Sequence, residues 1–213
     1  MAVDLVEESE QLLEDAVSLR RAIHAQPELG LELPLTQSLI ADSLEALDLE
    51  VHKGERVSSL VATIEGGTPG PTVLLRADMD ALPLNEDTGL DFSSGVAGRM
   101  HACGHDAHVA MLVGAAQLLV RHRNDLSGRV VLMFQPGEEG FAGARHMIEE
   151  GLLERYGTID RAHALHITPI FASGVIATRP GTLMASADAF RVTVTGRGGH
   201  ASTPADALDP VPV

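Results

Sequence analysis

The sequence predicts an α/β fold, because short apolar runs typical of strands alternate along the chain with segments of helical periodicity. The most apolar run, residues 129–134 (RVVLMF), is apolar on both faces, which is typical of a strand in the middle of a parallel sheet. The longest helical segment, residues 105–122, carries one apolar stripe that would face a core. Right-handed crossovers are expected between parallel strands.

The other elements follow from periodicity and from turn residues. Helices are expected over residues 5–23, 36–47, 105–122 and 143–150. Pro27 stops the first of these helices and Gly151 the last. Strands are expected over residues 59–64, 72–75, 129–134, 162–167 and 174–178. A Pro-Gly-Pro turn at residues 69–71 should precede the second strand.

A second module is expected near the C-terminus, because the pattern changes after Pro180. Residues 186–195 alternate like an antiparallel strand, and the glycines of residues 196–199 indicate a turn. We therefore expect one domain over residues 1–180 and the beginning of a smaller domain over residues 181–213.

Composition excludes several classes of protein. The 213 residues include 15 Lys and Arg against 30 Asp and Glu, and the net charge of −15 opposes binding to nucleic acid or to an anionic membrane. The single cysteine, Cys103, rules out an internal disulfide framework and fits a reducing compartment. The acidic N-terminus lacks a signal-peptide pattern, and the apolar stretch at 109–120 is too short to span a bilayer. We expect a cytoplasmic globular protein.

The densest chemical signal is the segment HACGHDAH at residues 101–108. Three of the chain's ten histidines, His101, His105 and His108, lie there with Cys103 and Asp106. Thiolate, imidazole and carboxylate are ligands of zinc and similar divalent ions. Capping of the following helix would explain any one of these residues, but the cluster favours a metal site.

Two acidic pairs follow predicted strands. Glu138 and Glu139 come directly after the most apolar strand, and ligand sites of open α/β sheets lie beyond the carboxyl ends of strands. One glutamate can bind metal while the other acts as a general base. Asp78 and Asp80 follow another strand, and such a carboxylate commonly orients a metal-binding histidine. Taken singly, each pair could equally be a solvated acidic turn.

Three further histidines are candidates. His163 and His166 are three apart on a predicted strand and would face opposite sides, so at most one should reach a given site. His166 is preferred because it lies nearer the carboxyl end. His200 follows two glycines in the predicted second module.

The residues leave two chemistries open for Cys103. It could be a nucleophile beside His105, as in cysteine hydrolases, or a metal ligand. The downstream glutamate pair and the histidine at a strand end fit a metal-dependent hydrolase better.

The ordered motifs RADMDALP, MHACGHDAHVAML, FQPGEEG, ALHITP and GRGGHAS, with IHAQPELGLE at residues 23–32, resemble the dinuclear-metal aminoacylase and carboxypeptidase superfamily. Within it, they are most similar to the branch of hippurate hydrolase, N-acyl-amino-acid amidohydrolases and plant indole-acetyl-amino-acid hydrolases, relatives of carboxypeptidase G. The resemblance implies a metallopeptidase-like mixed sheet with flanking helices, followed by the start of a small α+β lid and dimerisation domain. It also implies hydrolysis of the amide bond of N-acyl amino acids or related small conjugates.

The resemblance also implies roles for individual residues. Cys103 would bridge two divalent ions (zinc, manganese, cobalt or nickel), one bound also by His105 and His166 and the other by Glu139. Glu138 would be the general base and acid, and we group Asp80 with it as a catalytic residue. His200, from the lid domain, would hold the substrate carbonyl or oxyanion, across a homodimer. The branch has a histidine after the proline that follows GGHA, whereas here Ala205 follows Pro204.

Family members are nearly twice as long, and their second half supplies a last histidine ligand. We therefore expect these 213 residues alone to be inactive and to bind at most one metal well. Two alternatives stay open: a deacetylase of an acetylated diamino acid, and a non-catalytic fragment.

Overall fold

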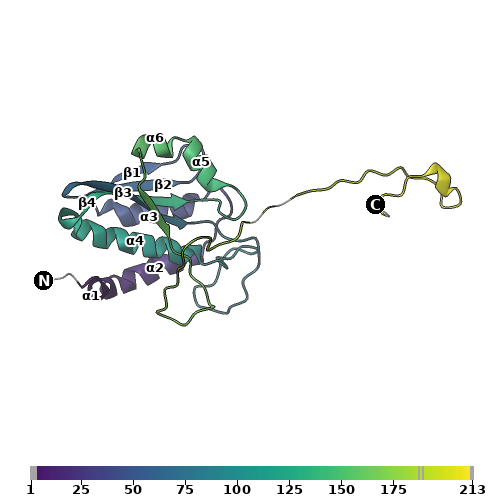
Figure 1. Ribbon diagram of the computed structural model, residues 1–213. Helices are drawn as coiled ribbons and strands as arrows, with labels where there is room; N and C mark the ends of the chain where they lie inside the picture. The colour runs from purple at the N-terminus through teal and green to yellow at the C-terminus, as the bar shows by residue number, and fades with distance from the viewer. Residues whose placement is uncertain (1–3, 187, 189, 212–213) are drawn as a thin grey trace. The chain divides into compact units, whose positions relative to one another are not determined.

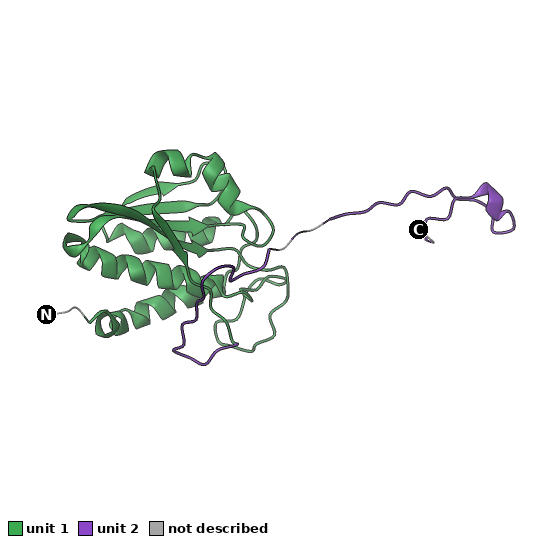
Figure 2. Cartoon of the chain, viewed as in Figure 1, with its two compact units in different colours: residues 1–169 green, residues 170–213 purple. Residues whose placement is uncertain are grey.

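The computed structural model describes residues 4–186, 188 and 190–211. They form two compact units, residues 1–169 and 170–213 (Figure 2). The division falls after Pro169, whereas the sequence pattern places a boundary near residue 180.

The first unit is built on a five-stranded mixed sheet (Figure 1). Its strands, in spatial order, are β1 (Glu50–Lys53), β2 (Leu60–Glu65), β4 (Ser127–Gln135), β3 (Thr68–Asp78) and β5 (Arg161–Ala164). The pairs β1–β2 and β2–β4 are antiparallel, and β3 is parallel to both β4 and β5. The predicted α/β fold with flanking helices is confirmed.

The described residues of this unit form six α-helices. They are α1 (Leu5–Glu10), α2 (Leu13–His24), α3 (Pro34–Glu45), α4 (His105–Arg121), α5 (Gly143–Glu149) and α6 (Leu152–Tyr156), with a short 3-10 turn at Arg123–Asp125. Helices α2, α3 and α4 lie on one face of the sheet, and α5 and α6 on the other (Figure 1). None of the helices in the described part of the chain has the length and apolar character needed to cross a membrane.

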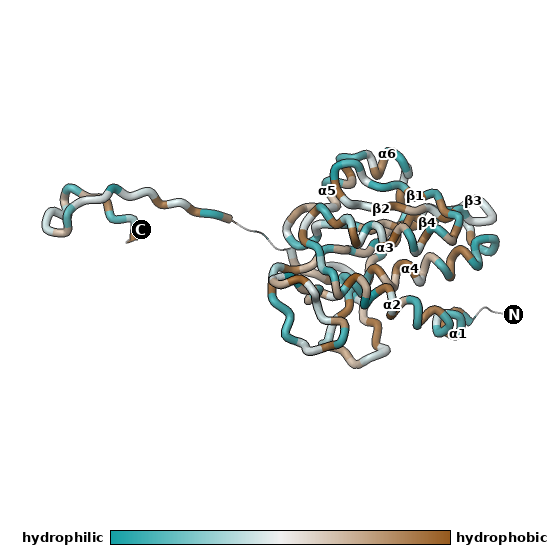
Figure 3. Tube along the Cα trace, turned by 180° about the vertical axis from the view of Figure 1, so that it is seen from behind, coloured by the Kyte–Doolittle hydropathy of each residue, from teal (hydrophilic) through white to brown (hydrophobic). Residues whose placement is uncertain are grey.

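Alternate residues of the central strands build two cores. In β4, Leu132 and Phe134 pack on the side of α2, α3 and α4, while Val131 and Met133 pack with α5 and α6. The helices contribute one face each, so hydrophobic and hydrophilic residues alternate along them (Figure 3). Burial on both faces fixes the register of β4, since a slip of one residue would exchange the two sets.

The IHAQPELGLE segment has a structural role. Glu28 is buried, and its carboxylate accepts hydrogen bonds from the backbone N–H groups of Leu35 and Thr36 and from the Thr36 hydroxyl. These groups lie in the first turn of α3, where N–H groups lack helical partners. The Glu28 carbonyl accepts a hydrogen bond from Ala81 N–H, which ties this segment to the chain leaving β3.

Several sequence-based expectations are corrected. The helix expected over 5–23 is divided into α1 and α2, and α3 spans 34–45 instead of 36–47. The Pro-Gly-Pro segment lies within β3, at an irregularity of register, and does not form a separate turn before it. β4 is central but lies in a mixed sheet, since its neighbour β2 is antiparallel. No pattern predicted β1 or α6, which have only four and five residues.

The structure differs more from the sequence-based expectations toward the C-terminus. β5 ends at Ala164 and not at residue 167, and residues 174–178 are not a strand. Of the strand expected over 186–195, residues 187 and 189 lie outside the described residues, and the others have no strand assignment. In place of a turn at 196–199, Arg197 pairs with Leu208 beside a 3-10 turn at Pro204–Asp206. Among the described residues of the second unit, none is buried.

We expect Phe134→Ala to lower the free energy of unfolding by about 3–5 kcal/mol, because the ring is fully buried and a cavity would remain. Phe190→Ala is the matched control: its side chain is 92% exposed, and a change within about 0.5 kcal/mol is expected. Urea unfolding followed by circular dichroism measures both. Equal effects of the two substitutions would contradict this account of the core.

Candidate metal centre

The parallel pairing of β3 with β4 brings two acidic motifs together. Asp78 lies opposite Gln135 at the carboxyl ends of these strands, and Met79 N–H donates to the Gln135 carbonyl. The chain continues from β3 to Asp80 and from β4 to the pair Glu138 and Glu139. Both acidic pairs thus follow strands, as expected from the sequence, and the parallel pairing brings them to one edge of the sheet.

Asp80 joins the two motifs directly. Its carboxylate is buried and accepts hydrogen bonds from the backbone N–H groups of Glu138 (2.9 Å) and Glu139 (3.0 Å). Both glutamate side chains are thereby presented on a fixed turn. Asp80 also lies 3.6 Å from Nδ1 of His105, so it faces the histidine that it was expected to orient.

Helix α4 begins at the same edge. Gly104 precedes His105 with φ of +82°, a left-handed conformation that favours glycine. A Cβ atom at Gly104 would also lie 2.3 Å from the Ile167 side chain. The sharp turn places Cys103 and His105 next to each other, one before the helix and one in its first turn.

His105 is surrounded by carboxylates. Its ring is 1% exposed, and Nε2 lies 3.6, 3.9 and 3.8 Å from oxygens of Asp78, Glu138 and Glu139. These separations are too long for hydrogen bonds, and neither ring nitrogen has a hydrogen-bond partner. A buried imidazole without partners amid four carboxylates, counting Asp80, suits a bound cation, because a cation would satisfy both the nitrogen and the negative charge.

Cys103 and His166 complete a set of three donors with His105. The Cys103 Sγ atom lies 3.4 Å from Nε2 of His166, and one ligand atom from each of the three residues lies within 4.8 Å of the others. Two ligands of one tetrahedral zinc, one sulfur and one nitrogen, are about 3.5 Å apart. The donor set therefore fits a divalent metal.

The electrostatics of the site favour a cation. Burial, reinforced by the negative charge of Glu139, raises the pKa of the Cys103 thiol to about 12. Burial also disfavours the charged forms of Asp78 and His105. At Asp78 the effect of burial is outweighed by the hydrogen bond with His108 and by neighbouring positive charge, which together lower the pKa of the carboxyl group to about 2. At His105 the effect of burial is outweighed by the surrounding carboxylates, which raise the pKa of the imidazole. A nucleophilic thiolate is disfavoured in this field, which weakens the cysteine-hydrolase alternative.

The structure separates His163 from His166. His163 lies within β5 opposite Leu75 and lines a small hollow of about 110 Å³ with Met111 and Leu112. His166 lies beyond the end of β5 and contacts Cys103. The preference for His166 is thus supported, but the reasoning from strand alternation was wrong, because the two residues do not share a strand.

Several buried residues of the site were not assigned from sequence. His108 lies 2.6 Å from Asp78, and Arg76 binds the same carboxylate. Asp106 is bound by His24 and Arg20 from α2. The signal available was the clustering of His108 and Asp106 around Cys103, which shows that the residues gather but not which of them bind metal.

Two other candidate histidines are not part of the set of three donors. His200 belongs to the second unit, where its ring lies 2.8 Å from the Ser202 hydroxyl. His101 is buried, and its two ring nitrogens have no hydrogen-bond partner. Burial lowers the pKa of His101 to about 4.

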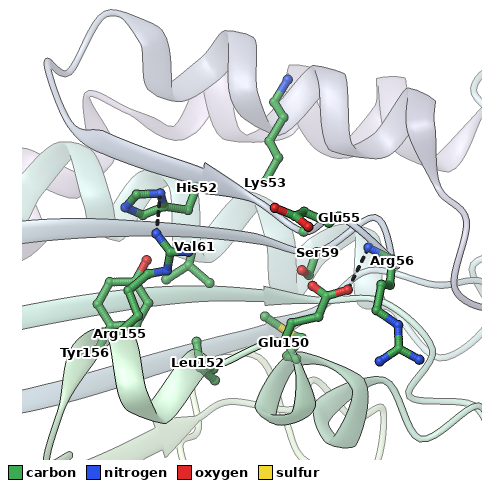
Figure 4. A pocket seen from close by; sticks show the side chains of 12 residues that line it. His52, Lys53, Glu55, Arg56, Ser59, Val61, Glu150, Leu152, Arg155 and Tyr156 are labelled. Atoms are coloured by element: carbon green, nitrogen blue, oxygen red, sulfur yellow. Dashed lines mark hydrogen bonds between the residues drawn. The ribbon is translucent and has the colours of Figure 1, made fainter.

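A different hollow of about 230 Å³ lies over β1 and β2 beside α5 and α6 (Figure 4). Glu150 accepts a hydrogen bond from Arg56 N–H there, and Arg155 lies beside His52. The residues of the candidate metal centre do not line it.

A mixed sheet whose parallel strand ends gather a thiol, imidazoles and paired carboxylates defines the class of metal-dependent hydrolases. A sequence profile of peptidase family M20/M25/M40 matches residues 74–210, and the chain belongs to this family. The resemblance seen in the motifs is confirmed.

The chain is 48% identical over 198 residues to thermostable carboxypeptidase 1 of Saccharolobus solfataricus, covering 92% of this chain and 50% of that protein. It is 44% identical over 195 residues to IAA-amino acid hydrolase ILR1-like 5 of Arabidopsis thaliana, covering 92% of this chain and 44% of that protein. The YxeP protein of Bacillus subtilis, described as a dinuclear metal binding peptidase of family M20, superposes with a TM-score of 0.71 at 38% identity. The match covers 76% of this chain and 45% of that one. The chain thus spans about half the length of the curated relatives it matches.

We expect His166→Ala to lower metal content and His163→Ala to leave it unchanged, because only His166 presents a nitrogen beside Cys103. Both variants should be loaded with zinc, desalted and analysed by atomic emission. Equal metal loss in the two variants would show that the assignment of His166 is wrong.

Proposed function

We propose that the protein hydrolyses the amide bond of an N-acyl amino acid or a related small conjugate, with the aid of two divalent metal ions. The observation that carries this proposal is the set of groups around the buried imidazole of His105. Cys103 and His166 lie beside it, and the carboxylates of Glu138 and Glu139 face it. Membership in the M20/M25/M40 family and the hydrolases among its relatives support it.

Cys103, His105 and His166 would hold one ion, and Cys103 with Glu139 would contribute to the other. When bound, such ions polarise the scissile carbonyl and lower the pKa of water. Zinc, manganese, cobalt and nickel all suit a set of thiolate, imidazole and carboxylate donors.

Glu138 would accept the proton of the attacking water and deliver it to the leaving amine. Its side chain is 42% exposed, more than the 23% of Glu139, which supports Glu138 as the residue that meets substrate and Glu139 as the ligand. Asp80 would act through both glutamates, by fixing their backbone.

The substrate side would involve His200, which we propose holds the substrate carbonyl or oxyanion from a lid domain within a homodimer. Gly198 supports this proposal, because the space that its Cβ would occupy is open and leaves room for a ligand to approach the backbone. A lone cysteine supports a reducing compartment such as the cytoplasm.

We expect Glu138→Gln to lower turnover at least about 100-fold while metal content stays unchanged, because the amide cannot accept a proton. Glu139→Gln is the paired variant and should lose metal. Hydrolysis of hippurate and other N-acyl amino acids, with metal analysis of the same samples, measures both effects. Metal loss in Glu138→Gln and retention in Glu139→Gln would reverse the two roles. No hydrolysis of any acyl amino acid by the metal-loaded protein would contradict the proposed function.

A further inference from the structure

His108 connects the metal centre to the chain beyond β5. It lies in α4 three residues after His105, and it is only 3% exposed. Its Nδ1 atom lies 2.6 Å from Oδ1 of Asp78, and its Nε2 atom lies 2.9 Å from the backbone nitrogen of Ile167. Both ring nitrogens are therefore occupied.

These partners fix the tautomer of His108. A backbone N–H can only donate, so Nε2 accepts from Ile167 and carries no proton. The proton therefore lies on Nδ1 and is donated to Asp78, whose other oxygen is bound by Arg76 at 2.5 Å. With its Nε2 lone pair used by Ile167, His108 is not available as a metal ligand, although it lies close to His105 and Asp78.

Ile167 also fixes the tautomer of His166, through its carbonyl group. The Ile167 carbonyl lies 2.6 Å from Nδ1 of His166, and a carbonyl can only accept, so Nδ1 of His166 is protonated. The lone pair of His166 is then on Nε2, the atom that lies 3.4 Å from the Cys103 sulfur. This is the tautomer that a ligand at that position needs.

Two further contacts join the segment after β5 to α4 and to the residue that precedes it. The pairing of β5 with β3 ends at Ala164, two residues before His166. The rings of His108 and His166 meet edge to face with centroids 4.7 Å apart, and the Ile167 side chain packs against Gly104. His108 therefore contacts the segment twice, through Nε2 and through its ring.

We propose that His108 is a positioning residue: anchored on Asp78, it binds Ile167 N–H and thereby presents Nε2 of His166 to the metal ion shared with Cys103 and His105. This inference rests on the proposed metal centre and deepens it. It predicts that removal of His108 weakens metal binding although His108 does not bind metal itself.

The test compares His108→Leu with His108→Gln. Leucine removes both hydrogen bonds, so the zinc dissociation constant, measured by competition with a chelator, should rise about 10- to 100-fold. The glutamine amide can donate to Asp78 through nitrogen and accept from Ile167 through oxygen, so it should restore most of the affinity. His163→Leu, on neighbouring β5, is the matched control and should leave the affinity unchanged.

Two further measurements separate the outcomes. Cys103→Ala and His166→Ala must weaken zinc binding. If they do not, the metal centre itself is wrong and this inference fails with it. If they do while His108→Leu binds zinc normally, or His108→Gln is as weak as His108→Leu, only the positioning role is overturned. Independently of any variant, nitrogen-15 NMR of the native protein should show His108 protonated at Nδ1, and protonation at Nε2 alone would overturn the inference.

Discussion

The parallel pairing of β3 with β4 is the constraint on which the site depends. Parallel strands end at the same edge of a sheet, so acidic residues that are distant in sequence lie close together there. The Asp80 carboxylate then binds the backbone of Glu138 and Glu139, which fixes the turn after β4 to the turn after β3. Without this pairing, the two motifs would be separate acidic loops.

The charge that results is costly unless it is compensated. Four carboxylates face the His105 ring, while Arg76 contacts only Asp78 among them. Like charges repel, and burial strengthens the repulsion because the local dielectric is low. A bound divalent cation removes this penalty, which couples metal binding to the stability of the sheet edge.

Much of this arrangement could be predicted from sequence, because it depends on local pattern. The central strand at 129–134 and the helix at 105–122 have strong patterns, and motifs that follow parallel strands lie at the same edge of the sheet. The antiparallel neighbour of β4 could not be predicted, since apolar residues on both faces are compatible with either direction. The early end of β5 was also missed, because no proline or glycine follows Ala164 before Pro169.

The roles of the clustered histidines were the least predictable part, for a physical reason. Imidazole can bind metal, donate or accept, and its sequence position does not select among these. Within one cluster, His105 has no hydrogen-bond partner, while His108 uses both nitrogens on Asp78 and Ile167. The partner of each nitrogen, set by the fold, decides which ring has a lone pair to offer. A histidine cluster in a sequence therefore indicates a candidate metal centre, and the hydrogen bonds around each ring show which nitrogens are left to bind a metal ion.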